Sequence, residues 1–349
     1  MSRSEISNVI FYFRGVNIKI TSIVTCILSY FFTPAYSCEE ALLNFPDDCQ
    51  FQDRYQEVKK AFQNEFNIDV LDINEYRALR FIGRSTWDSN LKKGQGDPRK
   101  MYKPAPVVWN LWSETEKWLR GIAPNTLGIK DIQEINRRSV NKDIMSVWAV
   151  KLKGARPGKI RSKKTQLPPQ FFYTCDKESA TYELVTFYKH FDVVDSRGRS
   201  LLRTSFHECP DLEGVYRGNV RYLKSSKVPR ELMKWINSYN TIDLGDLAPI
   251  DRVADLQRRF ISIHPFGDGN GRTSRFLQDQ YLTKWKLPLP ASGDLQKDLE
   301  TPTMQYRQNM KKAIERSLNV LEACLEQYRN SRGSPQVVVS PECRAEKTW

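Results

Sequence analysis

The sequence predicts a mainly α-helical protein with a short β-hairpin and a glycine-rich loop. Three observations support this prediction: several stretches repeat apolar residues at helical spacing, residues 213–229 have the pattern of a hairpin, and a glycine-rich segment separates two helical stretches. With 349 residues, 40% of them hydrophobic, the chain can hold one large domain or two ordinary ones. We therefore expect a folded protein with a substantial core.

The N-terminus has the features of an export signal. Residues 20–37 (ITSIVTCILSYFFTPAYS) are uncharged and mostly apolar, and they end in small residues at positions 35 and 37, as signal-peptide cleavage sites do. The sequence therefore predicts a cleaved signal peptide over residues 1–37 and an exported or secreted protein. An uncleaved membrane anchor is the alternative, because 18 weakly apolar residues are marginal for a membrane span. We expect membrane contact only if the N-terminal segment is uncleaved. A lipid anchor on Cys38 is a third, weaker option.

Cysteine usage agrees with export. Removal of the signal would leave an even number of cysteines, namely Cys38, Cys49, Cys175, Cys209, Cys324 and Cys343. An oxidising compartment could pair them all, although six free thiols in a reducing compartment stay possible and the sequence does not give the connectivity.

The chain is basic, with a formal net charge of +13. Such a charge suits nucleic acid, an anionic membrane or phosphorylated ligands, and it does not choose between them. The one concentration of basic residues, KLKGARPGKIRSKK at 151–164, carries seven basic side chains and no acid. A solvated loop or hairpin explains this run more simply than a dedicated polyanion site.

Residues 38–124 are expected to form an N-terminal helical region whose role the sequence does not indicate. Residues 54–66 and 111–122 each place apolar side chains on one helical face, and a stretch rich in Gly, Pro and Lys at 94–106 predicts a loop between them. The next helix is expected to begin at Asn125 as N-cap.

Three more helices are expected around the glycine-rich segment. Residues 229–240 and 247–263 have amphipathic spacing, and residues 272–285 have it again after the segment. The order is therefore helix, glycine-rich loop, helix.

This loop, HPFGDGNGRTSR at 264–275, has the composition of a phosphate site. It presents free backbone N–H groups at the start of the next helix, where these donors and the helix dipole favour an anion. Arg272 and Arg275 are three positions apart, so both would face that anion. Asp268 adds a hard oxygen ligand that suits Mg²⁺, and His264 has the ordinary pKa of a general base.

Other interpretations of the loop are weaker. A P-loop would need glycine at Phe266 and lysine at Arg272, and the dinucleotide fingerprint would need glycine at Arg272. A Gly-Asn-Gly turn or a lone histidine, taken singly, is more often structural than catalytic.

The loop fits the pattern HxFx[DE]GNGRxxR at every fixed position, and by this motif the chain resembles Fic-domain proteins. These proteins mostly transfer AMP from ATP to hydroxyl side chains of target proteins. GVYRGNVRYL at 214–223 resembles the family's β-hairpin flap, and LPLP at 287–290 stands where the family usually has a proline-bearing turn. The resemblance is good over about 213–320 and vaguer from about 125.

The resemblance implies a Fic-type helical bundle. Its catalytic domain would occupy 125–325, with an insertion around 150–212, and residues 326–349 would form a flexible tail.

The resemblance also implies roles for individual residues. His264 would be the general base that takes the proton from a Ser, Thr or Tyr hydroxyl of a target protein. Phe266 would be a buried anchor, and Asp268 would hold Mg²⁺ against the phosphates of ATP.

The rest of the motif would bind the nucleotide. The backbone of Gly269, Asn270 and Gly271 would form the anion hole, and the Asn270 side chain would also steady the α-phosphate. Arg272 and Arg275 would bind the β- and γ-phosphates. Phosphoryl-type transfer needs little beyond an in-line nucleophile and neutralised phosphate charge, so this division of roles is physically reasonable.

The flap would hold an extended segment of the target by strand addition. Its residues would be Gly214, Val215, Tyr216, Arg217, Gly218, Asn219 and Val220; an ordinary hairpin is the simpler alternative. GARPGKIRS at 154–162 is a second, weaker flap candidate. Because it lies far from His264 along the chain, we assign it to the insertion.

Many family members carry an inhibitory [ST]xxxE[GN] helix whose glutamate pairs with the last arginine of the motif. Residues 179–184 and 204–209 match only in part, because both lack the final Gly or Asn. We therefore expect no such helix, and an Arg275 without such a glutamate.

Protein adenylyltransferase is the leading function, with ATP and a hydroxyl-bearing protein as partners, Mg²⁺ as cofactor and no nucleic acid. Transfer of UMP or phosphocholine is the first alternative, whereas Gly271 argues against the phosphate-transferring type. A catalytically silent nucleotide-binding module is the second, and the intact His264 and Asp268 argue against it. The sequence does not indicate the oligomeric state.

Overall fold

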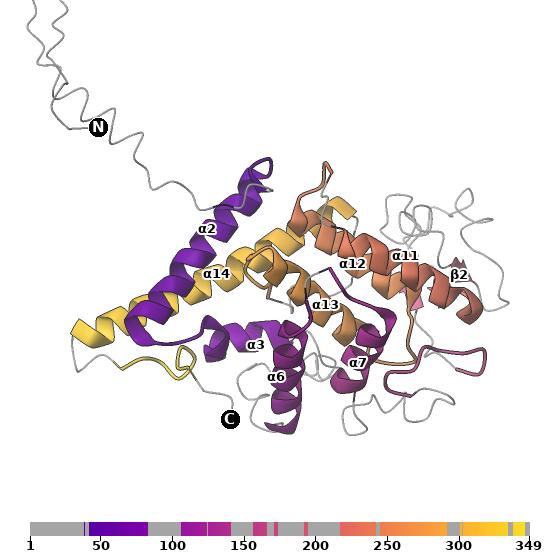
Figure 1. The fold of residues 1–349 in the computed structure, drawn as a ribbon, viewed down its shortest axis with the longest axis horizontal. Coiled ribbons are helices and arrows are strands. Elements are labelled where there is room, and N and C mark those ends of the chain that lie inside the picture. Colours follow the sequence, from indigo (N-terminus) through magenta and orange to yellow (C-terminus); the bar gives the residue numbers. More distant parts are fainter. Residues whose placement is uncertain are drawn as a thin grey trace, which may run out of the picture.

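The computed structural model describes residues 38, 42–82, 106–123, 125–140, 156–165, 171–173, 192–194, 217–241, 245–291, 301, 303–333 and 338–345. The expected signal peptide at 1–37 and the loop expected at 94–106, apart from its last residue, lie outside these residues. The described part is mainly helical, as predicted (Figure 1).

The helices follow one another along the chain with few strands between them. They are α2 (Pro46–Ala61), α3 (Asn74–Ile82), α6 (Pro106–Arg120), α7 (Ile129–Ser139), α11 (Val228–Asn240), α12 (Pro249–Ile263), α13 (Asn270–Lys284) and α14 (Thr303–Gly333). A π-helical turn, Phe62–Phe66, extends α2, and short 3-10 turns span Val70–Asp72 and Ser225–Lys227.

The centre of the molecule is built on α12, which packs against α11, α13 and α14 (Figure 1). Its apolar side chains are buried on several sides, among them Ile250, Phe260 and Ile263. Trp235 of α11 is also buried, and its indole N–H donates to the Leu256 carbonyl at 2.7 Å. A buried indole with a satisfied N–H contributes apolar contact without leaving a polar group unpaired. The α12–α13 pair is therefore held rigidly at the point where the glycine-rich loop connects the two helices.

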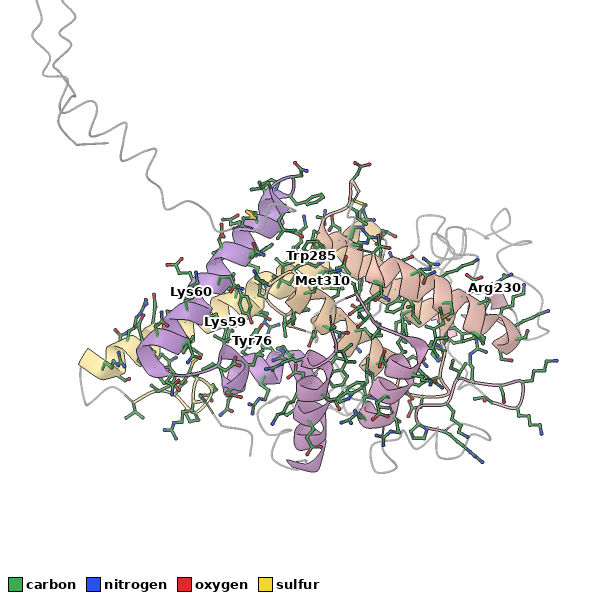
Figure 2. All side chains as sticks on the ribbon, viewed as in Figure 1. Lys59, Lys60, Tyr76, Arg230, Trp285 and Met310 are labelled. Carbon is green, nitrogen blue, oxygen red and sulfur yellow. A yellow bond between two sulfur atoms is a disulfide. The ribbon has the colours of Figure 1, made fainter. Side chains whose placement is uncertain are left out.

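The N-terminal helices share this core rather than forming a separate one. α2 and α3 pack on α14, and α6 packs on α7 and α13. Figure 2 shows Tyr76, Trp285 and Met310 toward the middle of the molecule, and all three are buried in one hydrophobic cluster. The described part of residues 38–124 thus shares one core with the helices on either side of the loop.

The expected β-hairpin at 213–229 is not confirmed. β3 (Arg217–Arg221) is the central strand of a three-stranded antiparallel sheet, between β1 (Phe171–Tyr173) and β2 (Asp192–Val194). Both partners of β3 come from the range predicted to be an insertion, and the backbone after β3 runs as coil into the next 3-10 turn. A partner strand that is distant in the sequence leaves no local turn signal, so the pattern alone could not identify it. Gly214, Val215 and Tyr216 lie outside the described residues.

The prediction of a flexible tail at 326–349 is wrong for most of that range. α14 continues to its end at Gly333, and residues 338–345 fold back onto α3. The backbone N–H of Asn74 donates to the Arg344 carbonyl at 3.0 Å, and a disulfide joins Cys324 to Cys343.

The helix expected from Asn125 begins later. Asn125 has a left-handed backbone with φ of 65°, which does not suit an N-cap residue. Gly128 is the N-cap of α7, and its N–H donates to the Asp131 carboxylate at 2.8 Å.

Two disulfides lie within the described part of the chain, Cys38–Cys49 and Cys324–Cys343. Cys175 and Cys209 lie outside it. No helix among the described residues combines the length and the hydropathy that crossing a membrane requires.

Candidate active site

The predicted order of helix, glycine-rich loop and helix is what the structure contains. α12 ends at Ile263, and His264 is its C-cap with a left-handed backbone, φ 50° and ψ 61°. The backbone N–H of His264 still donates to the Phe260 carbonyl at 3.1 Å. Gly269 is the N-cap of α13. The loop is therefore a tight turn that reverses the chain between two packed helices.

Gly269 has to be a glycine for two reasons. Its φ is 77°, a conformation that residues with a Cβ rarely adopt, and a Cβ at this position would overlap the Val140 side chain. The close approach of Val140 brings the end of α7 against the loop.

Asn270 closes the turn on itself. Its side-chain oxygen accepts from the Phe266 N–H and its side-chain N–H donates to the Phe266 carbonyl, both at 3.0 Å. Phe266 is fully buried beneath the loop, consistent with an anchor. The Asn270 amide therefore shapes the loop and keeps one N–H for its predicted contact with an α-phosphate.

The start of α13 has backbone donors that would suit an anion. The first bond inside this helix runs from the Thr273 N–H to the Gly269 carbonyl at 2.9 Å, so the N–H groups of residues 270–272 have no acceptor within the helix. These donors and the positive end of the helix dipole favour a negatively charged group there.

Arg272 is buried and held in place by the loop and by α7. Its guanidinium forms an ion pair with Asp268 at 3.1 Å and donates to the Ser139 carbonyl at 3.1 Å. Burial lowers the pKa of Arg272, and the Asp268 carboxylate opposes that shift. The other Asp268 oxygen accepts from the Gly269 N–H at 2.7 Å.

Arg275 is also buried, but no carboxylate pairs with it among the residues that the structure describes. The partial inhibitory motifs at 179–184 and 204–209 lie outside those residues. Among the described residues, Asp268 supplies the carboxylate that pairs with Arg272 at this helix N-terminus, where two arginines and the helix dipole would favour an anionic ligand.

Asp268 fits a magnesium ion that arrives with a nucleotide. Mg²⁺ is usually held by one or two carboxylates and completed by water and substrate phosphates. Within the described ranges no cluster of three His, Cys, Asp or Glu side chains could hold a metal by itself. Asp268 would therefore hold Mg²⁺ only together with the phosphates of a bound nucleotide.

His264 is buried and neutral. It stacks on Tyr222, with ring centroids 3.9 Å apart and an angle of 25° between the planes. Burial lowers the pKa of His264 to about 3; the positive charge of Arg161 adds to the shift, and the Ile261 carbonyl opposes it. The imidazole is therefore uncharged at neutral pH, and in this environment it is a weaker base than an ordinary histidine.

Arg161 is a site residue that the sequence analysis missed. Its Nε donates to the His264 carbonyl at 2.6 Å, and the same guanidinium donates to the carbonyls of Leu223 and Ile263. Its backbone N–H donates to the Pro265 carbonyl at 2.9 Å. Burial lowers the pKa of Arg161 to about 10, so it stays charged at neutral pH.

The segment around Arg161 belongs to the predicted insertion and is far from the motif in sequence, but it is close to the loop in space. Ile160 forms an isolated β-bridge with Phe266, so this segment lies directly against the loop. Its flap-like pattern was the available signal. The rest of the basic run is exposed where it is described, at Lys159, Lys163 and Lys164, as expected for a solvated loop.

Asn136 of α7 is a second missed residue. Its amide nitrogen donates to the Asp268 carbonyl at 3.0 Å and to the Thr273 hydroxyl at 3.1 Å, and its oxygen accepts from the Gly158 N–H at 2.8 Å. This one buried side chain ties α7, the loop, the start of α13 and the Arg161 segment together.

Residues 187–282 match the family model described as the Fic/DOC family. The chain contains a Fic domain. The match includes β2, β3, α11, α12, the 264–275 loop and most of α13. α7 and the Arg161 segment precede the matched residues, yet both contact the loop of the Fic domain.

Named relatives share only short stretches with this chain. A protein adenylyltransferase, fic-1 of Caenorhabditis elegans, is 32% identical over 59 residues, which are 17% of this chain and 11% of that protein. A Fido domain-containing protein of Dictyostelium discoideum is 30% identical over 79 residues, 22% of this chain and 55% of that protein.

Solved Fic proteins are also similar to this chain. A Fic domain-containing signaling protein from Bacteroides thetaiotaomicron has a TM-score of 0.44 and 16% identity, covering 78% of this chain and 97% of that one. Fic-1 of C. elegans has a TM-score of 0.40 and 14% identity, and the alignment covers 90% of this chain and 77% of that one.

Proposed function

We propose that this protein is a protein adenylyltransferase that transfers AMP from ATP with Mg²⁺ to a Ser, Thr or Tyr hydroxyl of a target protein. The observation that carries the proposal is a buried, neutral His264 on a loop that runs directly into the N-terminus of α13. A proton acceptor and a phosphate site on one short rigid turn are the two requirements of this chemistry.

In the proposed reaction His264 takes the proton of the target hydroxyl. The hydroxyl oxygen attacks the α-phosphorus, the bond between the α-phosphorus and the bridging oxygen breaks, and diphosphate leaves with the electron pair. The N–H groups at the start of α13 stabilise the charge on the α-phosphate oxygens. Arg272 and Arg275 pair with the oxygens of the leaving diphosphate.

Asp268 would hold Mg²⁺, which neutralises phosphate charge when bound. Because one Asp268 oxygen is paired with Arg272, the ion and the arginine would share this carboxylate. The hydrogen bonds from the Arg161 guanidinium to the carbonyls of His264, Leu223 and Ile263, here called the Arg161 clamp, would fix the His264 backbone and thereby the position of its imidazole.

The target-binding role of residues 214–220 stays a prediction. β3 already pairs with β1 through Arg217, Gly218 and Asn219, and with β2 through Asn219 and Val220. A target strand would therefore have to add elsewhere on this sheet or to residues 214–216.

We also propose that the protein is exported, with the two disulfides in support. ATP is scarce outside cells, so an exported adenylyltransferase would act in a lumen supplied with ATP or inside another cell to which it is delivered.

Transfer of UMP or phosphocholine is tested in the same assay as transfer of AMP. The full chain is incubated with Mg²⁺, candidate target proteins and ATP, UTP or CDP-choline in separate reactions, and the mass added to each target is measured. The proposal predicts added AMP with ATP and far less product with the other donors. A dominant UMP or phosphocholine adduct would contradict it.

A further inference from the structure

Exposed lysines lie on two segments that meet beside His264. They are Lys163 and Lys164, which follow Arg161, and Lys224 and Lys227, which lie between β3 and α11. We call these four lysines the basic surface. Neither residues 156–165 nor residues 222–230 include an acid. The structure thus joins the basic run at 151–164 to a second basic run that is distant in the sequence.

Two buried side chains anchor these segments to the candidate active site. The Arg161 guanidinium donates to the carbonyls of Leu223 and His264, and the Tyr222 ring stacks on the His264 ring. Figure 1 shows the 156–165 segment and the start of α11 at the same end of the molecule. The nearest lysines are only two positions from these anchors in the sequence, which is at most about 7 Å of extended chain. The basic surface therefore lies next to the loop that carries His264.

The charges of the basic surface are not balanced by acids in the part of the chain that the structure describes. None of its four lysines forms an ion pair there. The neighbouring acids are already paired: Glu231 of α11 lies 3.3 Å from Arg230, and Glu134 of α7 lies 2.5 Å from Arg137. These acids therefore do little to neutralise the lysines, and the surface keeps a positive potential.

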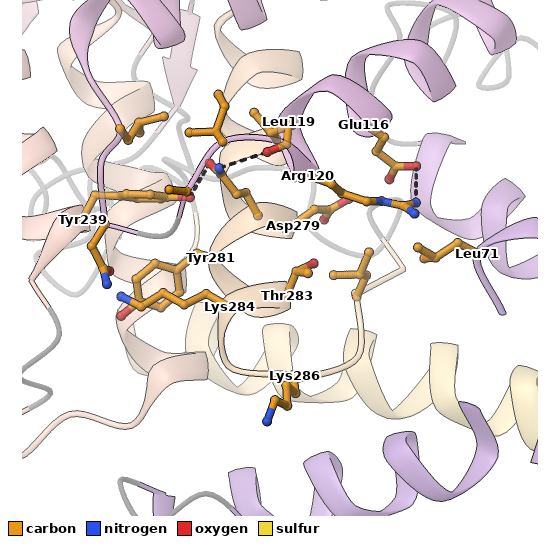
Figure 3. A pocket seen from close by; sticks show the side chains of 16 residues that line it. Leu71, Glu116, Leu119, Arg120, Tyr239, Asp279, Tyr281, Thr283, Lys284 and Lys286 are labelled. Atoms are coloured by element: carbon orange, nitrogen blue, oxygen red, sulfur yellow. Dashed lines mark hydrogen bonds and ion pairs between the residues drawn. The ribbon is translucent and has the colours of Figure 1, made fainter. Parts of the chain in front are cut away.

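Basic residues on other parts of the molecule often have acidic partners. Arg54 of α2 lies 2.8 Å from Glu322 of α14. At the pocket near the opposite end of α13, Arg120 lies 3.8 Å from Glu116 (Figure 3). A charged run alone usually means a solvated face, but unpaired charge from two segments beside a reactive loop attracts acidic groups to that loop.

We propose that the basic surface binds an acidic segment of the target protein, close to the hydroxyl that His264 deprotonates. This inference rests on the function proposed above, because in that function the target has to bring its hydroxyl to His264. Two residues of extended chain and a lysine side chain reach about 10–15 Å beyond Arg161. This reach corresponds to about three to five residues of an extended target. Carboxylates at such positions would pair with the lysines while the hydroxyl lies at His264.

Two peptides that differ only in charge test this surface. One has a central threonine with glutamates three to five positions away on each side, and the other has glutamines in their place. Each is labelled with fluorescein, and its binding to the full chain is measured by fluorescence anisotropy without ATP, at an ionic strength of about 0.1 M. We expect the glutamate peptide to bind at least about tenfold more tightly than the glutamine peptide. Lys163→Gln/Lys164→Gln should weaken binding of the glutamate peptide at least about threefold, and so should Lys224→Gln/Lys227→Gln.

Lys59→Gln/Lys60→Gln is the matched control, because it removes the same charge from two adjacent exposed lysines, which Figure 2 shows on the other side of the molecule from Arg230. It should weaken binding less than about 1.5-fold. Equal affinity of wild type for the two peptides, or an equal loss in the control, would overturn the proposal. Substitutions at the basic surface that weaken binding of phosphatidylserine vesicles or single-stranded RNA but not of the glutamate peptide would also overturn it. Because this assay contains no nucleotide, peptide binding without AMP transfer would contradict the proposed function alone.

Discussion

At the scale of the residue, burial sets the charge of His264. A pKa of about 3, against an ordinary value near 6.5, keeps the imidazole neutral over the physiological range. Because the folded pKa lies below the unfolded one, the stability that depends on this neutral form is complete above about pH 6.5 and is lost as pH falls toward 3. Approach of a phosphate would raise the pKa, since an anion favours the protonated imidazole. Such a change would strengthen His264 as a base once the nucleotide is bound.

Arg161 is expected to position His264 without touching the substrate. Arg161→Met removes the donor to three backbone carbonyls, so the His264 backbone should shift or loosen. We expect kcat for transfer to fall at least about tenfold while the affinity for ATP changes less than about twofold. Lys159→Met, at an exposed neighbour, should change neither quantity.

Arg161→Lys should recover only part of the lost rate, because an ammonium cannot reproduce the fork of donors on a guanidinium. Full activity of Arg161→Met, in steady-state kinetics with folding confirmed by circular dichroism, would show that the clamp is not needed.

Gly269 provides a test of how tightly the loop is packed. Gly269→Ala introduces both an unfavourable φ and an overlap with Val140, whereas Gly245→Ala introduces only an unfavourable φ, because no atom lies within 4 Å of that added Cβ. The left-handed conformation alone costs about 1–2 kcal/mol. Chemical unfolding should therefore show a clearly larger loss for Gly269→Ala than for Gly245→Ala. Equal losses would mean that Val140 does not crowd the loop.

At the scale of the element, the helix that ends at His264 is capped by a residue distant in sequence. The side chain of Ala248, the N-cap of α12, accepts no hydrogen bond from the start of this helix. The Asp48 carboxylate of α2 accepts a hydrogen bond from the Ile250 N–H at 2.9 Å instead. Burial raises the pKa of Asp48 to about 7, with the Ile250 hydrogen bond opposing. The stability of the start of α12 therefore depends on whether Asp48 of α2 is ionised.

Asp48→Asn is expected to change the pH dependence of stability. Because the folded pKa of Asp48 lies above its ordinary value of 3.8, its contribution is complete below that value and is lost as pH rises through 7. Asparagine keeps the acceptor and does not ionise. The Tm of Asp48→Asn minus that of wild type should be more positive at pH 8.5 than at pH 5. For Glu57→Gln, at an exposed carboxylate of the same helix, the difference should stay constant.

Sequence periodicity predicted the helices of this region closely, and it failed where contacts are long-range. Residues 229–240 and 247–263 correspond to α11 and α12 because each has one apolar face against a common core. Turn-forming residues predicted the loop between α12 and α13. The sheet around β3 and the Arg161 clamp were missed, because their partners lie up to about a hundred residues away and leave no local pattern.

At the scale of the whole molecule, the parts before and after the Fic domain belong to the same folded body. α2 and α3 pack on α14, and the Cys324–Cys343 disulfide holds the end of the chain near α3. The sequence could indicate helices in these parts but not their packing, because an amphipathic face does not specify which helix covers it. The flexible-tail prediction failed for this reason.

Export makes a prediction about the mature chain. Intact-mass analysis of the protein from its native cells should give a chain that begins at Cys38, and thiol labelling under denaturing conditions should leave Cys38, Cys49, Cys324 and Cys343 unlabelled. Reduction before labelling is the control that should expose all four. A chain that retains residues 1–37 would contradict cleavage, and four reactive thiols would contradict an oxidising compartment.

The central claim is that the 264–275 loop transfers AMP with His264 as the base. The most direct measurement uses the full chain with Mg²⁺ and ATP labelled at the α-phosphate, and compares protein-bound label between wild type and His264→Ala. The account predicts label on a target protein or on the enzyme itself with wild type, a loss of at least about a hundredfold in His264→Ala, and ATP affinity that the substitution leaves nearly unchanged. Near-normal labelling by His264→Ala would contradict the assignment of the base. Absence of protein labelling by a wild-type protein that binds ATP in the presence of its target would contradict AMP transfer.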